Sequence, residues 1–424
     1  MPKPYTADTP ETEQLRLRMF DEHVDLTRFT HYTFDSDFLT PSDGFHFVCS
    51  DEELPPREAA ALKTGAEVTL TVNDVRIADG YIDSIEVRAD RSGGRTYTIT
   101  GRDRLSPVVD AIADPTLQFK EGVTLAEFLR TLFTPFGWVK EEDFIIDASA
   151  DRAVRTGGDR GIKMTKGGKK KGPRPLKDFV LHQTKPHNHE GVFDFAKRVA
   201  QRFGLWIWSS ADGDQLIVGK PDFDQEPLYQ LRRRLDGSGN VEEGTVRFDQ
   251  ADQPGIVIAD GFSGGGEFGK GRIKAFAVNP YFGLDADGFV LPEVQALITK
   301  FPDAKQITLV TQPFTRRVKQ DFTRPMFLHD DESKTPEQLE AFVRREMSLL
   351  VRKSLTADYT VEGHGQYDED GVFTAWAPDT VVDVQDDVAG LHERMYVLGV
   401  HFEKSRRGGT QTRVHLIRLN SIQF

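Results

Sequence analysis

Four side chains that could bind a metal lie close together in the segment LHQTKPHNHEG: His182, His187, His189 and Glu190. Two histidines spaced i, i+2 with a nearby carboxylate supply ligands that a divalent cation accepts. The cluster, however, closes a basic, glycine-rich tract (residues 152–185) that has neither helical nor strand periodicity. Such a tract does not fix ligand geometry. We therefore favour a surface cluster without metal and keep a metal site as the alternative.

Other side chains capable of acid–base or nucleophilic chemistry occur in structural contexts. His46 in FHF and His364 in EGHGQ lie in strand-like runs, which predicts hydrogen-bonded structural histidines. Cys49 lies in the apolar run FHFVCS, which predicts a buried, unreactive thiol. Two adjacent acidic pairs lie in predicted turns, where nothing favours the paired carboxylates of a glycosidase. These are Asp330–Asp331 and Asp386–Asp387.

Signature motifs of catalysis are missing from the sequence. It has no Gly-x-x-x-x-Gly-Lys-Ser/Thr loop for phosphate, no Gly-x-Ser-x-Gly elbow and no His-Glu-x-x-His pair. We therefore assign no catalytic, cofactor-binding or metal-binding residue, and we predict a protein that is not an enzyme and uses no cofactor.

Composition narrows the remaining classes. The 424 residues have 38% hydrophobic content and a net charge of −13, which is ordinary for a folded protein and disfavours broad binding to nucleic acid or anionic lipid. No apolar run approaches the roughly 18–20 residues of a membrane span, and the N-terminus lacks the apolar core of a signal peptide. The single cysteine excludes an internal disulfide and suits a reducing compartment.

The elements that position these side chains are mainly strands. Residues 81–88 alternate, with Tyr81, Ile85 and Val87 on one face and Ile82 on the other. The Ser92-Gly93-Gly94 step predicts a hairpin tip, and a threonine-rich strand returns to residue 100.

A second segment repeats this hairpin. YVLGVHFEKSRRGGTQTRV, residues 396–414, aligns without a gap on YIDSIEVRADRSGGRTYTI, residues 81–99. A further strand precedes each copy: VTLTVN before the first and TVVDVQ before the second. Any two long hairpins share alternation and a Gly-Gly tip, but the preceding strands favour two copies of one β-domain.

The chain order then predicts an α+β, mainly β protein with two similar antiparallel β-barrels. Helices are expected at residues 123–136, where Thr124 is the N-cap, and at 192–203 and 335–350. Trp206 and Trp208 share one face of a buried strand rather than a platform for nucleic-acid bases. The expected division is an N-terminal extension (1–24), a first barrel (25–110), an α/β domain (111–225) with the basic loop (152–185), a second barrel (226–263 and 350–424) and an inserted subdomain (264–349).

The order of these motifs resembles a known family. ADGYIDSIEV and YTITGRDRL, then GVFDFAKRVAQRFGLWIWSSADGDQLIVGKP and finally YTVEGHGQYDEDGVFTAWAPDTVVDVQDD, look like the baseplate hub protein of contractile-tailed phages, in particular the Mu-like hub family. The lysine-rich loop (residues 163–177) and the segment 264–325 look longer than the family pattern needs, which leaves a phage-derived injection system open as the source.

The resemblance implies a structural ring subunit of the virion tail baseplate, assembled in the host cytoplasm. Three copies would form a homotrimer whose six barrel-like units match a hexameric tail tube protein, while the opposite side carries the trimeric central spike protein. Other baseplate proteins would surround it, no membrane span is implied, and DNA would pass through the channel without specific binding. The alternatives are a β-rich wall-degrading or carbohydrate-active enzyme and an oligomeric binding module.

Overall fold

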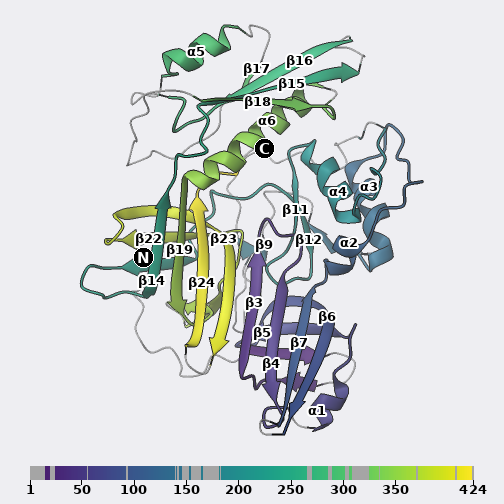
Figure 1. The fold of residues 1–424 in the computed structure, drawn as a ribbon, viewed down its shortest axis with the longest axis vertical. Helices are drawn as coiled ribbons and strands as arrows, with labels where there is room; N and C mark the ends of the chain where they lie inside the picture. Colours follow the sequence, from purple (N-terminus) through teal and green to yellow (C-terminus); the bar gives the residue numbers. More distant parts are fainter. Residues whose placement is uncertain are drawn as a thin grey trace.

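A computed structural model describes residues 15–19, 24–54, 56–91, 94–138, 140, 143–145, 152–153, 164–165, 181, 183–264, 270–284, 289–300, 305–307, 324–333, 335–368, 371–405 and 408–422. Its dominant feature is a thirteen-stranded sheet that contains two β-units. The predicted α+β, mainly β fold is confirmed. In Figure 1 the first β-unit occupies the lower part of the molecule and the second β-unit lies beside it.

The first β-unit has the strand order β3-β4-β7-β6-β5-β1-β2. Its strands are β1 (Leu15–Met19), β2 (Val24–Leu26), β3 (His31–Asp37), β4 (Gly44–Ser50), β5 (Glu67–Val72), β6 (Val75–Asp90) and β7 (Gly94–Asp103), and α1 (Pro56–Ala61) lies between β4 and β5. Residues 1–24 are expected from the sequence to be an extension, but part of this segment belongs to the sheet. Strand β1 pairs with β5, and its Leu15, Leu17 and Met19 are buried.

The second β-unit has the order β14-β19-β24-β23-β22-β13. Its strands are β13 (Tyr229–Arg233), β14 (Val241–Phe248), β19 (Leu355–Glu362), β22 (Thr380–Asp386), β23 (Leu391–Ser405) and β24 (Gly409–Arg418), with the short pair β20 (Gly365–Tyr367) and β21 (Phe373–Ala375) beside them. Strand for strand, β14-β19-β24-β23-β22 corresponds to β3-β4-β7-β6-β5. The sixth strands differ, since β13 runs parallel to β22 whereas β1 runs antiparallel to β5.

The two hairpins have the same register. In β6–β7, Tyr81 lies opposite Arg102 and Ile85 opposite Ile99. In β23–β24, the aligned residues Tyr396 and Val400 lie opposite the aligned Ile417 and Val414. Their equivalence therefore extends to the backbone pairing.

Each hairpin also has a β-bulge at the same aligned position, between Ile82 and Ser84 in one and between Val397 and Gly399 in the other. The bulge corrects one expectation. Strict alternation placed Ile82 and Ile85 on opposite faces, but the extra residue at the bulge turns both toward the same face. Their cross-strand partners, Gly101 and Ile99, accordingly lie two residues apart.

The α/β unit follows the first β-unit. It contains the two helices predicted over residues 123–136 and 192–203. It contains α2 (Ser106–Asp110), α3 (Leu125–Phe133), the 3₁₀ turn η1 (Thr134–Phe136), α4 (Val192–Gln201) and the strands β8 (Phe144–Ile145), β11 (Trp206–Ser209) and β12 (Leu216–Gly219). The two-residue strands β9 (Arg152–Ala153) and β10 (Met164–Thr165) pair with each other. Thr124 and Glu127 form a capping box at the start of α3. Phe128 and Phe195 meet edge to face at 5.1 Å in the core between α3 and α4.

The inserted unit lies at the top of Figure 1. It consists of β15 (Ile256–Gly264), β16 (Lys270–Val278), α5 (Pro292–Ile298), β17 (Lys305–Ile307), β18 (Pro325–Asp330) and α6 (Pro336–Val351), which η4 (Arg352–Ser354) joins to β19. The expected second barrel included residues 226–263, but β15 belongs to the four-stranded sheet β17-β16-β15-β18. β14 and β15 therefore enter different sheets although they follow each other in the chain.

Substitution of two glycines in neighbouring strands can test the packing of the first β-unit. A Cβ at Gly101 would lie 2.1 Å from Phe45 Cζ and 2.2 Å from the Tyr81 carbonyl oxygen, whereas a Cβ at Gly44 would meet no atom within 4 Å. We expect Gly101→Ala to lower the free energy of unfolding by about 1–3 kcal/mol through overpacking. Gly44→Ala, in the adjacent strand, is the matched control. Equal denaturant midpoints for both variants would contradict the packing.

Candidate functional site at the junction of the two β-units

The two β-units are joined through their backbones. Strand β3 of the first unit pairs antiparallel with β23 of the second, from Gly399 opposite Asp37 to Ser405 opposite His31. Without this pairing β3 and β23 would each expose a row of unpaired N–H and C=O groups. The junction therefore turns two units into one sheet.

The buried face of the junction is aromatic. Phe34 on β3 lies opposite Phe402 on β23 with ring centroids 5.6 Å apart, and both side chains are fully buried. Tyr32 and Phe34 point into the shared core while Thr33 and Asp35 do not, which is the alternation of a strand with one buried face.

His364 connects the two units beneath this sheet. It lies just before β20, not on a strand as expected, and its ring stacks on Phe402 at 4.4 Å. The Thr412 hydroxyl donates to the Gly363 carbonyl (2.6 Å), so its oxygen accepts from His364 Nδ1–H (2.9 Å). His364 Nε2 then accepts from the Tyr32 hydroxyl of the first unit (2.8 Å). The predicted hydrogen-bonded structural role of His364 is confirmed.

Full burial sets the protonation of this histidine. Burial, together with the positive charges of Lys404 and His401, lowers the pKa of His364 to about 3. The neutral ring thus suits its two hydrogen bonds.

The opposite face of the junction is polar. His401 Nδ1 lies 2.5 Å from Asp35 Oδ1, which makes the pair the outward counterpart of Phe34 and Phe402. The hydrogen bond to Asp35 raises the pKa of His401, against the opposing effect of burial. His46, which lies on β4 as predicted, is on the same outward face, 6.0 Å from the His31 ring.

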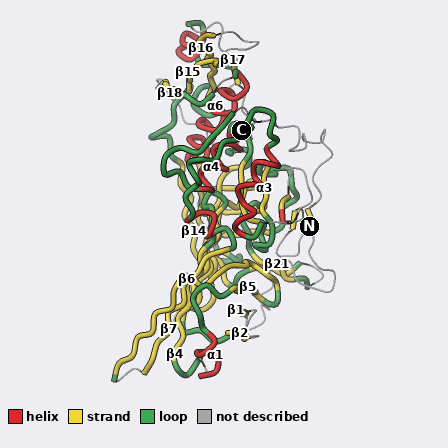
Figure 2. The backbone as a smooth tube through the Cα atoms, turned by 90° about the vertical axis from the view of Figure 1, so that its right-hand side faces the viewer, coloured by secondary structure: helices red, strands yellow, loops and turns green. Residues whose placement is uncertain are grey.

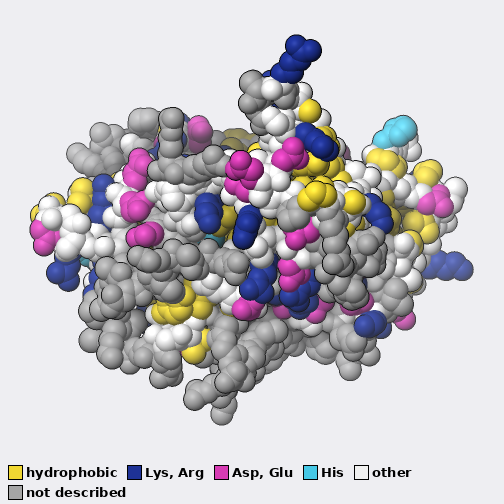
Figure 3. Space-filling model, turned by 90° about the horizontal axis from the view of Figure 1, so that it is seen from below, with side chains coloured by type: hydrophobic (Ala, Val, Ile, Leu, Met, Phe, Trp, Pro, Cys, Tyr) yellow, Lys and Arg dark blue, Asp and Glu magenta, His cyan; other side chains and the backbone are white. Residues whose placement is uncertain are grey.

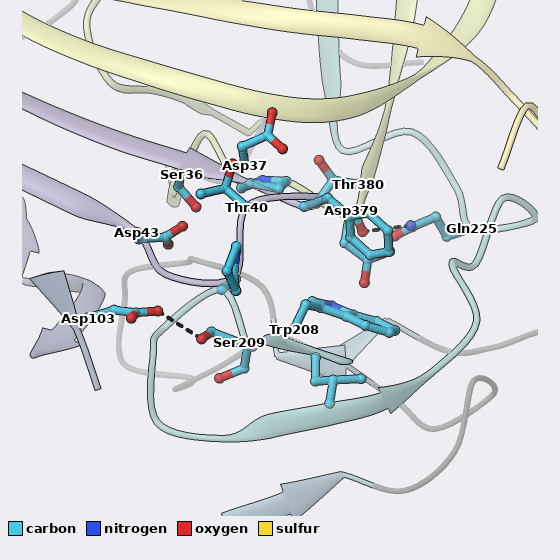
Figure 4. A pocket seen from close by; sticks show the side chains of 16 residues that line it. Ser36, Asp37, Thr40, Asp43, Asp103, Trp208, Ser209, Gln225, Asp379 and Thr380 are labelled. Atoms are coloured by element: carbon cyan, nitrogen blue, oxygen red, sulfur yellow. Dashed lines mark hydrogen bonds between the residues drawn. The ribbon is translucent and has the colours of Figure 1, made fainter. Parts of the chain in front are cut away.

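A small cavity lies where the β-units meet the α/β unit (Figure 4). Its volume of about 40 Å³ is far below the roughly 300 Å³ of a typical ligand pocket. Asp103 on its wall accepts hydrogen bonds from Ser42 (2.6 Å), Ser209 (2.9 Å) and the Leu105 N–H (3.1 Å). Burial raises the pKa of Asp103 to about 6. These contacts fasten β7 to β11, so we interpret the cavity as structural.

The histidine cluster of the sequence does not form a metal site among the described residues, and its Glu190 is bonded to other protein groups. His182 lies outside the described residues. The Glu190 carboxylate accepts from Arg198 Nε (2.6 Å), from Arg198 Nη2 (2.7 Å) and from the His187 N–H (2.7 Å). Within the described part of the chain, no group of three or more His, Cys, Asp and Glu is arranged to hold a metal.

The other singled-out side chains lie as expected. Cys49 is fully buried, and burial raises its pKa to about 12. Trp206 and Trp208 pack on Phe38, with centroids at 5.8 and 4.9 Å. Asp386 is the buried last residue of β22, and the N–H groups of Val388 and Ala389 in the following turn donate to it. Asp330, the last residue of β18, accepts from the N–H groups of the next turn, while Asp331 and Asp387 contact His329 and His392. The lysine-rich loop lies outside the described residues except for β10.

Comparisons with known proteins agree with this architecture. Residues 24–103 match the family described as "Mu phage baseplate assembly protein GpP-like, N-terminal". The fold is similar to a tail protein from Neisseria meningitidis MC58, with a TM-score of 0.66, 21% identity and coverage of 96% of this chain and 98% of that one. It is also similar to the prophage MuSo2 43 kDa tail protein from Shewanella oneidensis, with a TM-score of 0.64, 18% identity and coverage of 97% and 100%. No curated protein matches the sequence significantly.

These findings confirm the resemblance seen in the sequence. The first β-unit, over residues 24–103, matches a Mu-like baseplate assembly family, and nearly the whole chain has the fold of phage tail proteins. In the described part of the chain, no helix is both long and apolar enough to cross a membrane.

The buried histidine predicts a pH dependence of stability. The folded His364 stays neutral down to about pH 3, while the unfolded residue protonates near pH 6.5. The unfolded state therefore binds the extra proton, and stability falls as pH decreases between these values, by up to about 1.4 kcal/mol per pH unit. We expect His364→Gln to remove this slope.

Urea unfolding at about pH 7 and about pH 5 measures the difference. The raised pKa values of His401 and Asp103 act with the opposite sign, but they are present in both proteins and cancel. An unchanged pH slope in His364→Gln would contradict the assignment.

Proposed function

We propose that the chain is a structural subunit of a phage tail baseplate, in which three copies form a ring with pseudo-six-fold symmetry. The ring would join a hexameric tail tube to a trimeric central spike. The observation that carries the proposal is the identical register and bulge of the two hairpins. A three-fold ring of ordinary subunits offers three equivalent surfaces, but a ring of duplicated subunits offers six.

The joined sheet supports a channel at the centre of this ring. Along β3, β4 and β7, buried residues alternate with less buried ones, so one face forms the core and the other meets solvent. The solvent face carries polar side chains such as Thr98, Thr100 and Glu403. In this proposal that face lines a wet channel through which DNA passes without specific binding.

Figure 3 draws the lower end of the molecule, seen along the sheet and not onto its face. At this end, basic and acidic side chains of the described residues are interspersed rather than gathered into one basic patch. Specific or strong nucleic-acid binding would need such a patch.

The remaining units would contact other baseplate components. The α/β unit and the inserted unit lie toward the same end of the molecule in Figure 1, away from the tip of the β6–β7 hairpin. We propose that the two β-units form the ring itself and that the other two units reach the spike and the neighbouring baseplate proteins. In this proposal the protein belongs to the virion tail and is assembled in the host cytoplasm.

An enzyme is the weaker alternative. The first carboxylate of each acidic pair accepts backbone N–H groups of a turn, and the Asp103 cavity is too small for a substrate. A larger hollow of about 410 Å³ is lined by Glu190, but Arg198 holds that carboxylate in an ion pair. We therefore propose a structural role without catalysis, and an oligomeric binding module remains the alternative to a hub.

Light scattering on size-exclusion fractions tests the ring. We expect the purified chain to elute with three times the mass of one chain, and a mixture with its tube and spike proteins to give a heavier complex that contains three copies of the chain. A pull-down with tube protein should recover the trimer, whereas an unrelated tube protein serves as the control. A chain that stays monomeric with both partners present would overturn the proposal.

A further inference from the structure

Besides the terminal strands β2 and β13, the sheet has two further edges that no described strand covers. Beyond residue 82, β6 pairs with β7 on one side, and no other described strand pairs with its residues 84–90. At the far end of the sheet, β14 pairs only with β19 among the described strands. Both edges are long enough to accept another strand. Figure 2 shows β6 and β7 extending beyond the rest of the first β-unit.

The internal repeat makes these two edges equivalent to the two strands of the internal junction. The hairpin alignment makes residues 84–90 of β6 the counterpart of residues 399–405 of β23, which bind β3 inside the chain. Strand β14 is the counterpart of β3 itself. Phe47 on β4 lies opposite Ile99, as Tyr359 on β19 lies opposite the equivalent Val414. On the other side, Phe47 faces Tyr32 on β3 and Tyr359 faces Gly244 on β14, so Tyr32 and Gly244 are equivalent positions.

We propose that β6 of one chain pairs antiparallel with β14 of a second copy, in the register of the internal β3–β23 junction. The register sets Val87 opposite Val246, Glu86 opposite Arg247 and Ile85 opposite Phe248. The inference rests on the proposed ring and specifies how its subunits join. Applied three times, it closes the sheet of six β-units and leaves neither edge exposed.

Exposure of equivalent residues supports this pairing. Val87 is 54% exposed, but its counterpart Phe402 is fully buried by the internal junction. Phe248 is 39% exposed, whereas its counterpart Ser36 is 5% exposed. The positions that the internal junction buries are thus exposed at the two free edges, where both carry apolar side chains. Cross-strand contact would bury them against each other.

Charge also matches across the proposed interface. On the outward face of the internal junction, His401 pairs with Asp35. The counterparts of these residues are Glu86 and Arg247, which also carry opposite charges but with the signs exchanged. The Arg247 side chain is 71% exposed and forms an ion pair with the neighbouring Asp249, so its guanidinium can also reach a facing carboxylate. A like-charged pair at this position would oppose the register.

Disulfide formation tests the register directly. Directly opposed residues of an antiparallel pair have Cβ atoms roughly 4.5–5.5 Å apart, close to the range that a disulfide bridges. We expect Val87→Cys combined with Val246→Cys to give covalent dimers and trimers on oxidation. The control, Val87→Cys with Thr245→Cys, moves one thiol to the opposite face of the strand and should cross-link far less. The native Cys49 is buried in both proteins.

Mixing the two single-cysteine proteins separates contacts between chains from contacts within one. Val87→Cys mixed with Val246→Cys should give covalent dimers only, and each alone should give none at this interface. A second variant, Val87→Asp, should weaken trimer formation on the order of tenfold or more, because it buries an unpaired carboxylate. Ile112→Asp, at a 62% exposed position outside the β-units, is its matched control.

The outcomes distinguish the interface from the ring. Trimers by light scattering that do not cross-link through Val87 and Val246, and that tolerate Val87→Asp, would overturn this interface and leave the ring standing. Cross-linking to an unrelated protein in place of a second copy would also overturn it. A protein that stays monomeric with tube and spike proteins would overturn both proposals.

Discussion

The structure depends on one constraint: every edge strand of an extended sheet needs hydrogen-bond partners for its backbone. Inside the chain, β3 and β23 meet this need by pairing with each other, and the aromatic contact of Phe34 with Phe402 and the neutral His364 stabilise that pairing. The same duplication that creates the internal pair leaves one further edge of each kind, on β6 and on β14. A closed ring requires one unpaired strand edge on each side of the duplicated subunit, to pair with the next copy.

Much of this arrangement could be predicted from the sequence because its signals are local. Strand alternation, the Gly-Gly tips and the gapless match between the two hairpins all lie within short windows, and the structure confirms them down to the register. The N-cap at Thr124 and the helix that begins after Thr335 were predicted for the same reason. The bulge was not predicted, because an extra residue between Ile82 and Ser84 leaves no composition signal.

The features that were missed are non-local. The Tyr32–His364 bond joins residues 332 positions apart, and no periodicity identifies such a partner. For the same reason β1 was interpreted as part of an extension and β15 as part of the second barrel, since a short strand does not indicate which sheet it joins. The candidate metal residues were chosen by spacing alone, whereas the partners of Glu190 are set by the helix that carries Arg198. Of the junction itself, the sequence indicated His364 but neither the Asp35–His401 pair nor the strand that pairs with β3.

The central claim is that duplicated β-units let three chains present six nearly equivalent positions. A cryo-electron microscopy map of the assembled ring, reconstructed without imposed symmetry, measures this most directly. The account predicts one continuous sheet around a central channel, in which junctions within chains and junctions between chains alternate and superpose. A map in which the two β-units of each chain lie at different radii, or in which the subunits meet through the helical units alone, would contradict it.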